Sequence, residues 1–415
     1  MCRRAVLLLS ICLGAAPVCL LAQDFTLFDR QVQVHGFVSQ GFVHTNDNNW
    51  LTMNTSNVGS GEFTDFGANA STQITDKFRI GAQIYDRNLG ELGRWYPSLD
   101  WALADYRFKP WFGIRGGKVK TTLGLYNDAQ DLDFLRVFAL LPQSIYPTDI
   151  RDATIAHVGG DIYGNVSLKH RLGDLSYTGF AGHRSDSMHS GYAYLAMEYG
   201  VYYSSYGGLQ YGADLRWNTP LKGLLLGASR MNEDITGRAT AKNPSSIGPP
   251  FFPEIDHSKA DWTNQFYGSY AVGKLRIDSE YRRFLHNAYY TALGSVALTN
   301  ETDVRGWYVS GTYRIMKRLA LGSYYSRYSV TSVSGGPEGV YAPDQTDTSL
   351  PLNHVYDKVV SARVDLKKFW NVKVEGHFMD GYGFCTFPDG FYPQQNPQGF
   401  KPNTDALVLK SSLNF

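Results

Sequence analysis

Short runs of the chain alternate apolar and polar residues, which predicts β-strands with two different faces. The run at residues 405–415 shows the pattern clearly. Its apolar parity holds Leu407, Leu409, Leu413 and Phe415, and its mostly polar parity holds Val408, Lys410, Ser412 and Asn414. Such a strand fits the last strand of a closed membrane barrel, which pairs with the first strand and leaves no edge. It also fits an edge strand docked on a soluble β-sandwich.

The same alternation begins near the start of the mature chain. Residues 31–44 predict a strand, and residues 45–62 predict a polar loop. A second run ends at Ile74, and a tight reversal at residues 75–77 leads to a third run that starts at Phe78. Each later pair of runs is likewise joined by a short turn and followed by a long loop rich in Gly, Asn, Asp and Pro.

The positions of the turns and loops set the number of strands. Short turns are expected near residues 75, 109–110, 172–174, 218–220, 273, 316–318 and 367–368. Long loops are expected at residues 45–62, 88–98, 126–152, 183–205, 232–260, 284–302, 329–354 and 381–404. These fifteen connections imply about sixteen strands, with both chain ends on the short-turn side. We therefore predict an all-β fold, a transmembrane antiparallel β-barrel of about sixteen strands.

Charged residues on the polar parity favour the barrel over the sandwich. Asp214 and Arg216, for example, alternate with the apolar Leu215 and Trp217. A sandwich would bury such charges at a cost on the order of several kcal/mol each when they are unpaired. A barrel of about sixteen strands keeps them in a wet lumen. Residues 99–108, the run that follows them and the position of Asn264 alternate less regularly, so their facing stays open.

The first 22 residues have the charged, apolar and small-residue order of a secretory signal, which ends at Ala22. We therefore expect a signal peptide at residues 1–22 and an outer-membrane β-barrel at residues 23–415. Of the four cysteines only Cys385 follows the signal. A single cysteine forms no internal disulfide, so the barrel is expected to hold without one.

Composition narrows the class of protein further. The chain has 39 basic and 38 acidic residues, so it shows no strong bias toward nucleic acid or acidic lipid. A mean hydropathy of −0.28, together with the absence of any apolar run of about 18 residues after the signal, excludes a helical membrane protein. Alternating membrane strands of about 10 residues escape such an average. The 28 Tyr, 23 Phe and 8 Trp suit a barrel with aromatic girdles at both membrane interfaces.

The third long loop, residues 126–152, breaks the alternating pattern. Asp131 is placed to cap a short helix over residues 132–141, which Pro142 would end. An apolar helix face packed on the inner wall would leave Asp128, Asp131 and Asp133 pointing at the passage. An ordinary helix on the surface is the alternative.

Three segments carry a family resemblance: VHGFVSQGF at residues 34–42, GIRGGKVKTTLGLYND at 113–128 and LVLKSSLNF at 407–415. With them the chain resembles bacterial outer-membrane porins, and more narrowly the phosphate-selective-porin-like and dicarboxylate-porin group. The likeness covers the architecture of the whole mature chain, while the motifs are specific only for the broad group. The run of arginines and the lysine cluster of a true phosphate channel are missing from the sequence, which leaves the solute open.

The resemblance implies a trimeric, water-filled channel in the outer membrane of a Gram-negative bacterium. It also implies a third loop that folds into the barrel and narrows it. Phe415 matches the terminal aromatic residue that the barrel assembly machinery reads in this family. The expected partners are therefore outer-membrane lipid and lipopolysaccharide, small polar solutes, that machinery and two further copies of the chain.

Inward parity assigns a set of basic residues to the wall near the short turns. The expected pore-lining arginines are Arg79, Arg115, Arg216, Arg276, Arg314 and Arg363. Asp105, Asp214, Asp278 and Asp365 each lie two residues from an arginine, so much of this charge is expected to be paired. With Asp128, Asp131 and Asp133 opposite on the third loop, a transverse field would favour anions such as carboxylates or phosphate.

Two other classes of function remain open, a barrel enzyme resembling a lipase or protease and a structural or adhesive barrel. The chain has none of the common metal-binding, nucleotide-binding or serine-hydrolase motifs, so no enzyme, cofactor or metal is expected. His183, Asp186, Ser187 and His189 lie together, but their place in a long loop favours a solvated segment. Because sixteen strands enclose a lumen, the channel is the function that we expect.

Overall fold

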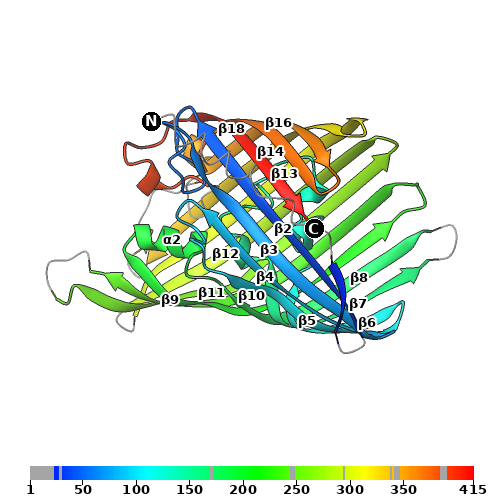
Figure 1. Cartoon of the computed structure of the whole chain (residues 1–415). Helices are drawn as coiled ribbons and strands as arrows, with labels where there is room; N and C mark the ends of the chain where they lie inside the picture. Colours follow the sequence, from blue (N-terminus) through cyan, green and yellow to red (C-terminus); the bar gives the residue numbers. More distant parts are fainter. Residues whose placement is uncertain are drawn as a thin grey trace.

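The structure is a computed structural model that describes residues 23–27, 30–168, 172–243, 248–292, 295–336, 339–340, 346–383 and 390–415. Within these residues the chain forms a closed antiparallel barrel of 16 strands, which confirms the predicted fold class (Figure 1). The expected signal peptide and Cys385 lie outside the described residues.

The barrel strands follow one another around the wall in chain order. They are β2 (Arg30–Thr45), β3 (Ser60–Thr75), β4 (Phe78–Leu89), β5 (Ser98–Lys109), β6 (Phe112–Lys120), β7 (Ala156–Ser167), β8 (Asp174–Ser185), β9 (Val201–Asn218), β10 (Leu224–Lys242), β11 (Phe251–Val272), β12 (Leu275–Ala292), β13 (Ser295–Met316), β14 (Leu319–Gly336), β16 (His354–Lys367), β17 (Trp370–Asp380) and β18 (Asn403–Asn414). The short strand β1 (Gln23–Leu27) pairs with β2, and β15 (Gly339–Val340) pairs with β14.

The helical elements all lie in the connections. They are α2 (Gly191–Glu198) and the 3₁₀ turns η1 (Asn127–Ala129), η2 (Asp133–Leu135), η3 (Arg151–Ala153), η4 (Pro351–Asn353) and η5 (Pro393–Gln395).

Pairing between β18 and β2 closes the barrel. Leu413 lies opposite Val38, and the backbone groups of Phe415 and Gly36 exchange two hydrogen bonds of 2.9 Å. A Cβ at position 36 would lie 2.3 Å from the ring of Phe415, so the glycine leaves room for that ring. The final strand is therefore the closing strand of a barrel, and the alternative of an edge strand on a sandwich is wrong.

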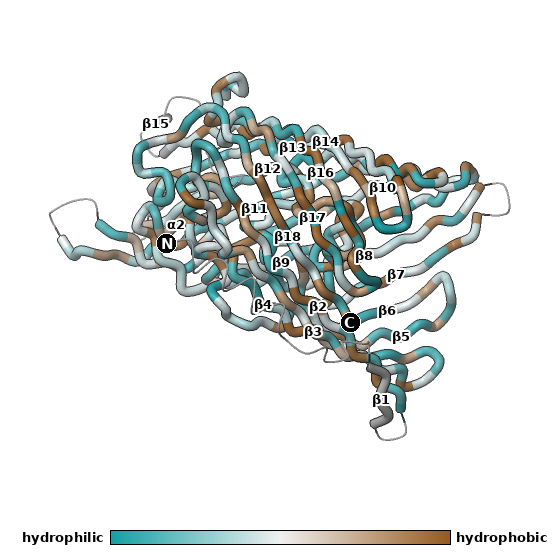
Figure 2. Tube along the Cα trace, turned by 45° about the horizontal axis from the view of Figure 1, so that its top comes forward, coloured by the Kyte–Doolittle hydropathy of each residue, from teal (hydrophilic) through white to brown (hydrophobic). Residues whose placement is uncertain are grey.

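The predicted alternation gives the wall its two faces. On β9, Leu209 and Leu215 face outward with 49% and 48% of their surface exposed, whereas Gln210 and Asp214 are 0% and 2% exposed on the inner face. Figure 2 shows hydrophobic and hydrophilic positions mixed along the strands in this way. The irregular run at residues 99–108 contains a β-bulge, because Trp101 and Leu99 pair with the adjacent residues Gln83 and Ile84 of β4.

The seven predicted short turns all lie between consecutive strands, but two predicted long loops are wrong. The proposed loops at 232–260 and 284–302 are mostly strand, since β10 continues to Lys242 and β12 to Ala292. These extended strands run to the left of the barrel in Figure 1. Their inner face combines apolar residues with polar ones, among them the buried Glu233 and Asp256, and this composition resembles that of a loop.

An apolar core lies inside the long-loop end of the barrel. Loops and wall both contribute nearly unexposed side chains to this apolar cluster. The loops supply Trp50, Leu51, Met53, Leu92, Ala139, Leu140, Tyr194, Phe391 and Tyr392, and the strands supply Val43, Phe63, Leu89, Val304, Tyr328, Val330, Val355, Met379, Ala406 and Val408. The inward-facing residues of the strands are apolar at the long-loop end, where the loops pack against them. Nearer the short turns the inward-facing residues include charged ones.

Candidate functional site

The third loop, residues 121–155 between β6 and β7, contacts inward-facing residues of several strands. The helix expected over residues 132–141 is wrong, because the loop contains only the turns η1, η2 and η3. Glu375 of β17 accepts hydrogen bonds from the backbone N–H groups of Ala139 and Leu140 at 2.9 and 3.2 Å. These wall contacts take the amides that a helix would have directed to its own carbonyl groups.

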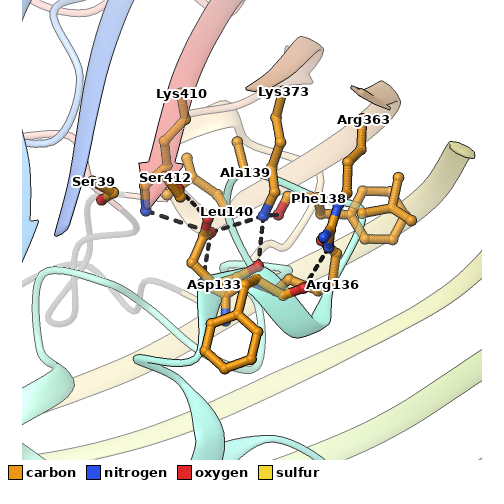
Figure 3. Close-up of polar contacts among 12 residues, drawn as sticks. Ser39, Asp133, Arg136, Phe138, Ala139, Leu140, Arg363, Lys373, Lys410 and Ser412 are labelled. Atoms are coloured by element: carbon orange, nitrogen blue, oxygen red, sulfur yellow. Dashed lines mark hydrogen bonds and ion pairs between the residues drawn. The ribbon is translucent and has the colours of Figure 1, made fainter. Parts of the chain in front are cut away.

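Asp133 joins the third loop to the strands that close the barrel. Its carboxylate lies 2.9 Å from the Lys373 ammonium of β17 and 3.5 Å from the Lys410 ammonium of β18. Ser412 donates a hydrogen bond of 2.5 Å to the same carboxylate. Figure 3 shows these groups converging on Asp133. Burial alone would raise the pKa of Asp133, but the two lysines and Arg136 outweigh it and lower that pKa.

Asp131 makes a second ionic contact on the opposite side of the loop. Lys120 lies 2.5 Å from its carboxylate, and Gln83 of β4 donates a 2.5 Å hydrogen bond to it. The pKa of Asp131 is lowered because Lys120 and Arg151 outweigh the effect of burial. The sequence analysis expected Asp131 and Asp133 to point at the passage. In the structure both carboxylates are instead buried in ion pairs. Asp128 lies in η1 and is partly exposed.

The remainder of the third loop contacts β12 and β13. Tyr146 donates a 2.8 Å hydrogen bond to Glu280 of β12, and the backbone N–H of Leu125 donates another of 2.9 Å to the same carboxylate. On β13, a Cβ at Gly306 would lie 2.0 Å from the backbone oxygen of Ser144. The loop backbone therefore packs directly on that strand at a position where only glycine leaves space.

The expected pore-lining arginines all have polar partners. Three of them pair with the carboxylate two residues away, as predicted: Arg216 with Asp214 at 3.0 Å, Arg276 with Asp278 at 2.9 Å, and Arg363 with Asp365 at 2.7 Å. The others pair across strands: Arg115 with Asp105 at 3.6 Å and Asp161 at 3.8 Å, Arg314 with Asp365 at 3.4 Å, and Arg79 with the Ser71 hydroxyl at 2.7 Å.

Tyrosines complete three of these pairs. Tyr163 donates a hydrogen bond to Asp105, Tyr267 donates one of 2.6 Å to Asp214, and Tyr126 donates one of 2.5 Å to Asp278. The paired guanidinium carbons of Arg115, Arg216 and Arg276 lie 4.1, 5.9 and 5.8 Å from the centres of the same tyrosine rings. Each such Arg–Asp–Tyr set fixes its guanidinium from two sides.

The sequence analysis missed the wall residues that hold the third loop. Lys120, Lys373, Lys410, Glu280 and Glu375 were not singled out, although each has a charged side chain on the inner face of a strand. Inner parity combined with near-complete burial identifies Lys373, Lys410, Glu280 and Glu375, while Lys120 is 16% exposed. Burial of a charge requires a partner, and that partner comes from the loop, which strand periodicity does not reveal.

Asp186 and His189, which lie close together in the sequence of the fourth long loop, make separate contacts in the structure. Both carboxylate oxygens of Asp186 accept hydrogen bonds from Arg184 at 2.7 Å, and the His189 ring stacks on Tyr96 at 3.9 Å between ring centres. In the part of the chain that the structure describes, no group of three or more His, Cys, Asp or Glu side chains is arranged to hold a metal ion. None of the described helices is long and apolar enough to cross a membrane.

No protein-family model matches the chain, and no curated protein matches it. Solved structures do match. The outer membrane protein OmpT of Vibrio cholerae, folded in vitro, aligns over 95% of this chain and 100% of its own with 10% identity and a TM-score of 0.53. The outer membrane channel DcaP of Acinetobacter baumannii aligns over 95% and 100% with 14% identity and a TM-score of 0.52.

An anion-selective porin from Comamonas acidovorans aligns over 93% of this chain and 100% of its own, with 8% identity and a TM-score of 0.51. The likeness in all three cases is one of fold. The chain has the fold of the outer-membrane β-barrels of Gram-negative bacteria.

Proposed function

We propose that the chain is a porin, a water-filled channel in the outer membrane through which small hydrophilic solutes diffuse passively. The observation that carries this proposal is the third loop, which is bonded to inward-facing charges on strands far apart around the wall. Asp133 contacts β17 and β18, while Tyr146 contacts β12. A loop held in this way inside the barrel narrows the lumen and gives the passage fixed, polar walls.

The proposed passage runs between the third loop and the arginine-bearing wall. Its lining is formed by Arg79, Arg115, Arg216, Arg276, Arg314 and Arg363, with Asp128 on the loop. Asp131 and Asp133 have a different role in this proposal. Paired with Lys120, Lys373 and Lys410, they fix the position of the loop and add little negative charge to the passage.

Unequal exposure of the ion pairs supports a preference for anions. The side chain of Arg276 is 47% exposed and that of Asp278 only 7%. Arg216 is 25% exposed and Asp214 only 2%. At these two pairs water in the lumen meets the guanidinium more than the carboxylate, whereas at the pair of Arg363 (13% exposed) and Asp365 (23% exposed) it meets the carboxylate more. The proposed preference for anions rests on the positive local potential at the first two pairs. Small carboxylates and phosphate are the solutes that this potential favours, in line with the phosphate-selective and dicarboxylate groups.

We further propose a homotrimer that is inserted by the barrel assembly machinery through the strand ending in Phe415. A trimer form of OmpT of Vibrio cholerae is among the structures of similar fold, which supports this oligomeric state. The chain would contact outer-membrane lipid and lipopolysaccharide with the outward apolar side chains of its strands.

The test is conductance in a planar lipid bilayer, followed by the reversal potential under a salt gradient. The purified protein should conduct in steps, in groups of three for a trimer, and the parent should prefer anions. Arg115→Ala and Arg276→Ala should each move the reversal potential toward cation preference, and Asp131→Asn should move it little. The matched control is Arg238→Ala on the outward face of β10. Folded protein that never conducts refutes the channel, and a cation-selective parent refutes the anion preference.

A further inference from the structure

A row of basic side chains crosses the outer face of the barrel. Arg230 of β10 lies opposite Asn264 of β11, Asn264 lies opposite Arg283 of β12, and Arg283 lies opposite Arg305 of β13. All four alternate with buried inward residues, so they point away from the lumen. This arginine row, Arg230, Asn264, Arg283 and Arg305, is separate from the pore-lining arginines.

The arginine row marks one edge of the apolar outer band. Between the short turns and the row, most outward residues are exposed and apolar, with Ser279 as a polar exception. They are Leu275, Ile277 and Tyr281 on β12, and Ile315, Tyr313 and Val309 on β13. The span from turn to row is roughly the 10 residues of a membrane strand. Beyond the row the outward positions of β13 are acidic, namely Asp303 and Glu301. The row thus lies where the proposed membrane ends on the long-loop side.

The charges of the row are only partly compensated. Arg283 and Arg305 both bond to Asp303, at 2.9 and 2.8 Å. Arg230 donates hydrogen bonds to two neutral partners, the side-chain oxygens of Asn232 and Asn264, at 3.0 Å each. Three guanidinium groups and one carboxylate leave a net charge of +2. The nearest other outward carboxylates, Asp234 and Glu301, lie farther along the strands, away from the apolar band.

Part of this arrangement is unfavourable for the fold. Like charges directly opposite each other on neighbouring strands repel, as Arg283 and Arg305 do. Cations on the outer wall are tolerated only near a membrane interface. Trp262 lies between two members of the row, with its ring centre 4.9 Å from the guanidinium of Arg230 and 5.4 Å from that of Arg283. The indole therefore packs against both guanidinium groups on the outer surface.

We propose that the arginine row binds the phosphate groups of an anionic glycolipid headgroup in the outer leaflet, that is, the phosphorylated sugar part of lipopolysaccharide. Guanidinium groups bind phosphate oxygens through paired hydrogen bonds, and basic clusters at the edge of a membrane select anionic headgroups. Trp262 and Tyr281 supply the amphipathic rings that lie at headgroup level. The inference rests on the membrane orientation in the proposed function.

The test is binding of purified lipid A to the detergent-folded full-length protein, measured as the shift of its thermal unfolding with lipid concentration. The triple variant Arg230→Gln, Arg283→Gln, Arg305→Gln should lose roughly tenfold or more in apparent affinity. Arg238→Gln, on the same face of β10 but beyond the row, is the matched control and should bind like the parent. If the triple variant does not fold, Arg230→Gln alone serves, because it leaves both Asp303 pairs intact.

Three comparisons separate the sources of phosphate and the occupants of the surface. Dephosphorylated lipid A and vesicles of neutral phosphatidylcholine should produce no shift, and inorganic phosphate should compete only weakly. Equal binding of phosphorylated and dephosphorylated lipid A would overturn the proposal, as would an unchanged triple variant. Dissociation of an oligomer in the triple variant would instead assign the row to contacts between copies. Bilayer conductance should be normal in every variant. A failed lipid A binding test would therefore leave the channel proposal unaffected.

Discussion

The ammonium of Lys373 lies 2.9 Å from the carboxylate of Asp133 in a position with no exposure to solvent. The same ammonium donates hydrogen bonds to the backbone oxygens of Asp133 and Phe138 at 2.7 and 3.0 Å. One wall residue therefore satisfies a carboxylate and two carbonyl groups of the third loop. Strand β17 supplies both Lys373 and Glu375 at neighbouring inward positions. Lys373 binds the carboxylate and carbonyl oxygens of the loop, and Glu375 binds its backbone N–H groups.

Replacing Lys373 with Met should release the third loop. The buried Asp133 would lose its nearest cation, and breaking a buried pair typically costs about 3–5 kcal/mol in the free energy of unfolding. We expect a loss of stability in that range, measured by denaturant unfolding, and a larger, noisier single-channel conductance. Lys358→Met, at an exposed lysine of β16, is the control and should change neither quantity. Equal effects of the two variants would show that Lys373 does not hold the loop.

Alternation could predict the wall because each strand position faces either lipid or lumen. The parity of Asp214 and Leu215 was correct for this reason, and so were the seven short turns. The third loop could not be predicted in the same way. Its amides at Ala139 and Leu140 bond to Glu375, more than 230 residues away in sequence, and local propensity contains no information about such a partner.

Two other features show where the pattern fails. The extension of β10–β13 was read as loop because charged residues such as Glu233 occupy its inner face, where Arg184 pairs with that carboxylate at 2.8 Å. The facing of Asn264 was left open because it is polar, yet it lies on the outer face, where Arg230 donates a hydrogen bond to it. In both cases a partner from another strand lets a polar residue occupy a strand position. The sequence alone does not reveal that partner.

Trp50→Ala tests whether the apolar cluster narrows the long-loop end. Trp50 is 1% exposed, and its ring centre lies 5.1 Å from that of His377. Removing a buried Trp costs about 3–5 kcal/mol in the free energy of unfolding. We expect this destabilisation together with an increase in conductance, since the loops would pack less tightly. Trp95→Ala, at a residue 52% exposed, should leave both nearly unchanged. Stable protein with parental conductance would place the narrow point elsewhere.

The contact between α2 and the eighth loop should depend on pH. Burial raises the pKa of Glu198 to about 7, and its carboxyl group accepts a 3.0 Å hydrogen bond from the backbone N–H of Gln394. Because the folded pKa lies above the ordinary value, the neutral form stabilises the contact. This contribution is complete at low pH and is lost as the pH rises through about 7.

Limited proteolysis at residues 390–402 measures this effect. The parent should be cleaved faster at pH 8.5 than at pH 5.5, each about 1.5 pH units from the transition. Glu198→Gln keeps a neutral acceptor at all pH values, so its cleavage should stay slow and change little. Tyr194, which donates a hydrogen bond to Gln394, does not titrate in this range, since burial raises its pKa above the ordinary value. A pH dependence that persists in Glu198→Gln would assign the effect to another group.

The last prediction separates two roles of Phe415, recognition during assembly and packing in the closed barrel. Its backbone bonds to Gly36, and its ring fills the space where a Cβ of residue 36 would lie. Deleting Phe415 removes both the terminal aromatic and the packing, so we expect accumulation in the periplasm and little protein in the outer membrane. Gly36→Ala keeps the terminal aromatic but displaces its ring, at a cost of about 1–3 kcal/mol for overpacking. That variant should reach the outer membrane in normal amounts and unfold at a lower temperature.

Cell fractionation with Asn414→Ala as control measures the first outcome, and thermal unfolding measures the second. Normal outer-membrane levels without Phe415 would show that closure by β18 and β2 suffices for assembly, whereas equal losses in both variants would show that packing at Gly36 is the step that assembly requires.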